Sequence, residues 1–87
     1  MSEPTAEQIA EEQWRLRRLR ALVDLTVATL YQADITAEEA IEIIVDCRRS
    51  ALCLFPGRED TFDLLYRPRL LRVVRERFEE CLPDRLL

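Results

Sequence analysis

The sequence predicts an all-α protein: a small bundle of three long helices and one short helix within a single domain, residues 1–87. Apolar residues recur at helical spacing along most of the chain, and no segment alternates as a strand would. The few Pro and Gly residues divide the chain into segments. We expect helices at about 5–33, 36–54, 60–66 and 68–82, with frayed ends at 1–5 and 83–87.

The first expected helix, 5–33, begins after Pro4, where Thr5 and Glu7 favour a helix N-terminus. Its core-facing stripe covers an arc of roughly 80°. This stripe consists of Ile9, Leu16, Leu19, Val23, Val27 and Leu30. A second stripe, Trp14, Leu22 and Leu25, is offset by about 100–130°. One core contact would not cover both stripes, so the helix has either two neighbours within the chain or a contact with another copy.

The second expected helix, 36–54, starts with a capping box formed by Thr36 and Glu39. It ends where Pro56 and Gly57 prevent continuation. Its apolar positions spread over an arc of roughly 200°, so this helix should be the most buried.

A short third helix, 60–66, can be capped by Asp60 and Thr61. The fourth begins at Pro68, which suits the first turn of a helix. Without a break at Arg67-Pro68, the apolar faces of these two segments would point about 150° apart. The sequence therefore predicts a break or a sharp kink at this point.

The composition argues against several classes of function. The chain lacks His and Lys and has one Gly, which removes the usual tools of catalysis and of phosphate binding, so we expect no enzyme and no cofactor. The net charge of −4 disfavours nucleic acids and anionic membranes, and no apolar run is long enough for a membrane span. The lack of a secretory signal and the odd number of Cys, three, favour the cytoplasm.

The thiols and the acidic side chains give weak signals. Cys47 and Cys81 fall on apolar faces and read as small core residues, whereas Cys53 falls on the polar arc of its helix and should be an exposed thiol. A stripe of carboxylates, Glu38, Glu42 and Asp46, could hold a hard cation but is better explained as a solvated helix face. We therefore expect no metal site.

Arginine supplies the two remaining candidate sites. Arg48 lies inside the apolar arc of the second helix and needs a partner. That partner is either a carboxylate such as Asp63 or Asp24 or a group on another molecule, unless the side chain extends to solvent. Beside Trp14 stands a basic cluster formed by Arg15, Arg17, Arg18 and Arg20. Such a cluster could contact a phosphate backbone, although nearby acids can neutralise it.

These observations favour a non-enzymatic interaction module, completed as a homodimer, that presents helix surfaces to a protein partner of unknown identity. The expected interface residues are Trp14, Leu22, Leu25 and Arg48. The alternative hypothesis is a nucleic-acid-associated regulator that uses the cluster from Arg15 to Arg20.

Overall fold

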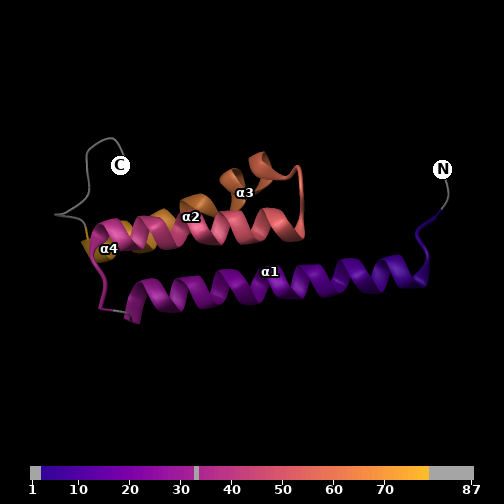
Figure 1. Ribbon diagram of the computed structural model, residues 1–87, viewed down its shortest axis with the longest axis horizontal. Helices are drawn as coiled ribbons and strands as arrows, with labels where there is room; N and C mark the ends of the chain where they lie inside the picture. The colour runs from indigo at the N-terminus through magenta and orange to yellow at the C-terminus, as the bar shows by residue number, and fades with distance from the viewer. Residues whose placement is uncertain (1–2, 33, 79–87) are drawn as a thin grey trace.

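The computed structural model describes residues 3–32 and 34–78, and within these residues the chain forms four helices and no strand. They are α1 (Ala6–Gln32), α2 (Ala37–Leu54), α3 (Glu59–Leu65) and α4 (Arg67–Phe78). α2 runs antiparallel to α1 and to α4, and the short α3 connects the end of α2 to α4 (Figure 1). The predicted all-α fold class, a small helical bundle, is confirmed.

Two capping boxes fix the starts of the long helices. At α2 the Thr36 hydroxyl accepts from the Glu39 N–H, and the Glu39 carboxylate accepts from the Thr36 N–H, each at 3.1 Å, as predicted. At α1 the sequence analysis indicated Thr5 but missed its partner, Gln8. The Thr5 N–H donates to Gln8 Oε1 at 2.8 Å, and the Gln8 N–H donates to Thr5 Oγ1 at 3.1 Å.

The predicted break between the last two helices is present, but the start of α3 needs a correction. α3 begins at Glu59, one residue earlier than expected, and Arg58 occupies the N-cap without a side-chain hydrogen bond. Asp60 and Thr61, the expected caps, both lie inside the helix; Asp60 is in the first turn and stabilises the helix through the dipole. α3 ends at Leu65, and α4 begins at Arg67, directly before Pro68. Residues 79–82 of the expected last helix lie outside the described residues.

All four helices contribute to one hydrophobic core. Leu30, Leu70 and Val74 are completely buried at its centre. The rest of the core cluster is Leu19, Val23, Ala40, Ile44, Cys47, Ala51, Phe62 and Val73. Thr26 is the buried polar residue of α1, and its hydroxyl donates to the Leu22 carbonyl at 2.7 Å, so its burial leaves no unpaired donor.

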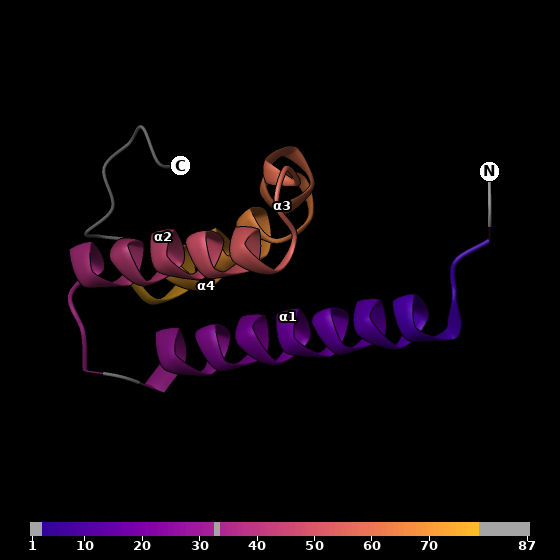
Figure 2. The ribbon, with the colours of Figure 1, turned by 45° about the vertical axis from the view of Figure 1, so that its right-hand side comes forward.

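α1 is longer than the helices that cover it. Its 27 residues span roughly 40 Å, whereas the 18 residues of α2 span roughly 27 Å. The N-terminal turns of α1 therefore extend past the end of the bundle formed by α2 and α3, which both views show (Figures 1 and 2). No described helix is long and apolar enough to cross a membrane.

Candidate interaction surfaces

The side of α1 that points away from the bundle carries exposed apolar residues. We call Trp14, Ala21 and Leu25 the outer face of α1; they fall within about 40° of the helix circumference. Trp14 is 51% exposed and Leu25 is 67% exposed. Leu22, the third residue of the predicted second stripe, is only partly exposed and packs against the core. The stripe is therefore divided: Trp14 and Leu25 are exposed, whereas Leu22 packs against the core.

A second exposed apolar surface lies where α1 extends past the end of α2. Ile9 and Leu16 belong to the predicted core-facing stripe, yet they are 44% and 45% exposed. Beside Leu16 lies an open groove of about 290 Å³ between α1, the end of α2 and α3. Its apolar lining includes Leu52, Phe55 and Leu65, and Glu12 and Arg58 are its charged residues. We call this surface the end groove.

Arg48 forms a bidentate ion pair with Asp63 of α3. Its Nε donates to Asp63 Oδ1 at 2.8 Å, and its Nη2 donates to Oδ2 at 3.1 Å. These hydrogen bonds hold the pKa of the Asp63 carboxyl below its ordinary value and raise the pKa of Arg48. Of the alternatives that the sequence left open for Arg48, the structure has the ion pair with Asp63 of the same chain, and this pair connects α2 to α3.

The basic cluster of α1 is only partly neutralised within the chain. Arg15 pairs with Glu11 at 3.1 Å, one turn earlier. Among the described residues, no carboxylate lies within ion-pair distance of Arg17, Arg18 or Arg20. These three side chains point in directions that differ by up to about 160° around the helix, so they do not form one continuous basic face. Arg18 lies over the Trp14 ring, 5.4 Å from its centroid.

Asp24, which the sequence analysis considered as a partner for Arg48, faces α4 instead. Its carboxylate lies 3.8 Å from the Arg69 guanidinium. Both groups are more than half exposed, so this ion pair contributes little to stability.

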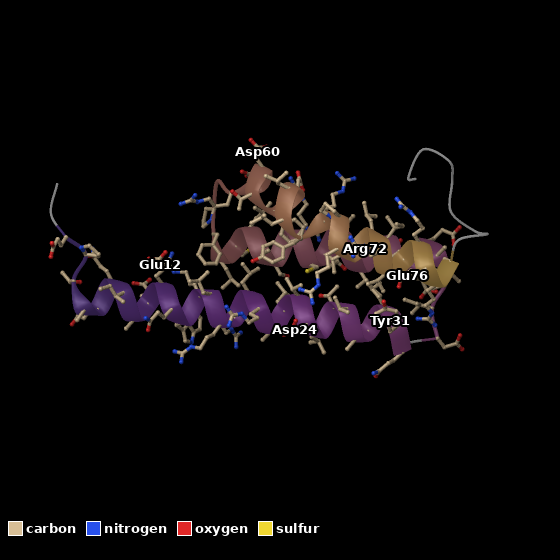
Figure 3. The ribbon with its side chains drawn as sticks, turned by 180° about the vertical axis from the view of Figure 1, so that it is seen from behind. Glu12, Asp24, Tyr31, Asp60, Arg72 and Glu76 are labelled. Carbon is tan, nitrogen blue, oxygen red and sulfur yellow. The ribbon has the colours of Figure 1, made fainter. Side chains whose placement is uncertain are left out.

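At the other end of the bundle, α1 and α4 are joined by a polar contact that the sequence did not reveal. The Tyr31 hydroxyl donates to Glu76 Oε2 at 2.9 Å, and Figure 3 shows these two side chains facing each other from α1 and α4. The hydrogen bond to this carboxylate raises the pKa of Tyr31. Next to it, the Arg77 guanidinium donates to the Leu30 carbonyl at 2.5 Å. The residues of each pair are far apart in sequence, so helical periodicity alone gives no signal for these contacts.

The two described thiols differ in their exposure to solvent. Cys47 is buried in the core, where desolvation raises the pKa of its thiol, whereas Cys53 is exposed on α2. Cys81 lies outside the described residues. The acidic stripe of α2 is exposed, and its Asp46 pairs with Arg49 at 3.2 Å. Within residues 3–32 and 34–78, no group of three or more His, Cys, Asp or Glu side chains is placed to hold a metal ion.

Comparison with known proteins gives no relative from which a function could be transferred. No family model, curated protein or solved structure matches this chain. The interpretation of the outer face of α1, the end groove and the basic cluster therefore rests on their chemistry alone.

Proposed function

We propose that the protein is a non-enzymatic helical interaction module, which forms a homodimer and presents helix surfaces to a protein partner. The observation that carries this proposal is the exposure of large apolar side chains on two sides of α1. Trp14 and Leu25 are exposed on the outer face, and Ile9 and Leu16 at the open end of the bundle. Contiguous exposed apolar surface marks sites of protein association. Aromatic residues are enriched among the interface residues that contribute most of the affinity.

The two surfaces suit two different contacts. The outer face is a convex strip along one helix, which fits another helix side by side. The end groove is concave and apolar, which fits the apolar side of an amphipathic segment from a protein partner. The proposal includes a cytoplasmic location, for which the odd number of Cys gives compositional support.

Sedimentation velocity over the micromolar range tests the proposal. We expect a dimer whose population falls on dilution, and a Trp14→Ala substitution should weaken it. Leu64→Ala is the matched control for Leu25→Ala, because Leu64 is 76% exposed but lies on α3. Loss of association with Leu25→Ala but not with Leu64→Ala assigns the contact to α1. A wild-type protein that stays monomeric throughout the micromolar range contradicts the proposed dimer.

One observation supports nucleic-acid binding as a second candidate function: Arg17, Arg18 and Arg20 have no carboxylate partner within the described part of the chain. Their spread around α1 and the net charge of −4 oppose it. A gel shift at low salt with duplex DNA and with RNA distinguishes the two candidates. Binding that falls steeply with added salt and is lost in Arg17→Glu/Arg20→Glu would favour this second function, and the absence of any shift would exclude it.

A further inference from the structure

Exposed side chains of opposite charge flank the outer face of α1, before and after Trp14 along the helix. Glu7 and Glu11 precede Trp14, whereas Arg17 and Arg18 follow it. All five side chains are exposed, and they fall within about 120° of the helix circumference. The midpoint between the two acids and the two bases lies beside Trp14. Read in the reverse direction, this face is therefore complementary to itself.

We infer that two copies of this chain pair through their outer faces, with the α1 helices antiparallel about a twofold axis beside Trp14. In this arrangement Glu7 and Glu11 of one copy lie over Arg17 and Arg18 of the second copy, and the same contact repeats on the other side of the axis. A parallel arrangement would place acid over acid and base over base. The inference rests on the homodimer proposed above and supplies its geometry.

The charges of this face are still available for contacts between copies. Glu7, Arg17 and Arg18 have no ion-pair partner among the described residues. Glu11 is 3.1 Å from Arg15 in its own helix, and a carboxylate can accept from more than one donor. Because exposed ion pairs contribute little free energy, these charges determine the direction of pairing more than its strength.

The apolar residues supply the affinity. Beside the axis, the Trp14 side chains of both copies meet and exclude water from the centre of the contact, where truncation usually costs most. Ala21 is small and exposed, which lets the two helices approach closely along the next turns. Leu25 lies at the margin of the contact, opposite the residues that precede α1 in the second copy. Trp14→Ala should therefore weaken the dimer more than Leu25→Ala.

The capping box at the start of α1 keeps this face helical where the rest of the bundle no longer supports it. The paired Thr5 and Gln8 contacts hold the first turn, in which Glu7 lies. The acidic half of the face is therefore presented on a helix whose spacing matches that of the basic half. This match is what the antiparallel register requires.

Charge reversal in two complementary variants tests the arrangement. Glu7→Arg/Glu11→Arg makes the face basic throughout, and Arg17→Glu/Arg18→Glu makes it acidic throughout. Each variant alone should have a dissociation constant raised about tenfold or more, because like charges then oppose each other. An equimolar mixture should regain a dimer close to wild-type affinity, since the basic face of one variant meets the acidic face of the other. Sedimentation velocity of each variant and of the mixture provides the measurement.

Two controls accompany these variants. Glu38→Arg/Glu42→Arg changes the net charge by the same amount as Glu7→Arg/Glu11→Arg but on α2, and it should leave dimerisation unchanged. Trp14 is the single Trp of the chain, so its fluorescence should shift to shorter wavelength as wild-type dimers form and in the mixture, but in neither charge-reversed variant alone.

The outcomes separate this inference from the proposed function. A monomeric wild type contradicts both. A dimeric wild type whose charge-reversed variants still dimerise alone, or whose mixture does not associate, overturns the antiparallel outer-face contact and leaves the homodimer to be formed by another surface. Loss of each homodimer together with recovery in the mixture supports the inference.

Discussion

Truncation of Leu70 to Ala should destabilise the fold strongly. Leu70 is completely buried on α4, at the centre of the core formed with α1 and α2. The substitution removes apolar area from the core and leaves a cavity, because the neighbouring side chains relax only partly. Such Leu→Ala changes lower the free energy of unfolding by about 3–5 kcal/mol. A domain of this size has a total stability on the order of 4–13 kcal/mol. The variant should therefore lose a large fraction of its stability.

Urea unfolding, followed by far-ultraviolet circular dichroism, measures this loss. All proteins are compared at one concentration, because a dimer makes apparent stability depend on concentration. Leu64→Ala is again the matched control: Leu64 is 76% exposed, and its truncation should change stability by less than about 0.5 kcal/mol. A cost for Leu70→Ala as small as that of the control would refute the packing of α4 described here.

Three further predictions concern the polar contacts and the thiols. Arg48 lowers the pKa of Asp63, so the ionised Asp63 carboxylate should stabilise the fold above its ordinary pKa of 3.8. This stabilisation should disappear as the pH falls through the lowered pKa. In acid unfolding, Asp63→Asn should remove that part of the pH dependence. Thr36→Ala removes the acceptor of the Glu39 N–H and should cost about 0.5–2 kcal/mol in the same urea assay, so an unchanged midpoint would contradict the capping box. In a Cys81→Ser background, a thiol reagent should label Cys53 rapidly and Cys47 only on unfolding; equal protection of both would contradict the structure.

The parts of the fold that depend on local signals could be predicted from the sequence. The capping box at Thr36 and the break at Pro68 each involve residues close in sequence, so local side-chain and backbone chemistry determines them. The start of α3 was misplaced by one residue because Arg58 caps it without a side-chain hydrogen bond, and therefore without a sequence signal. The partner of Tyr31, Glu76, could not be predicted, because their contact depends on how α1 and α4 lie in space.

For the candidate surfaces of α1, the sequence predicts the side of the helix on which each residue lies, but not whether a neighbouring helix covers it. Periodicity places Ile9 and Leu16 on the same side as the buried Leu19, but it does not show where α2 ends, so both residues were assigned to the core while the structure leaves them exposed. The same limit applies to Leu22, which lies at the margin of the buried side and packs partly against the core. An angle around a helix axis follows from sequence, whereas coverage depends on the length and position of its neighbours.

The proposed contact with a second copy would explain the length of α1. The first buried residue of this helix is Leu19, so the turns from Ala6 to Arg18 contribute nothing to the core. Most helical stability in proteins comes from tertiary packing, which these turns largely lack within the chain; the cap at Thr5, the ion pair of Glu11 with Arg15 and the contact of Arg18 with Trp14 support them. Antiparallel pairing with a second copy would bury its outer face and place its acids over bases. The same contact would therefore account for the order of charges in these turns and for their helical structure beyond the end of the bundle.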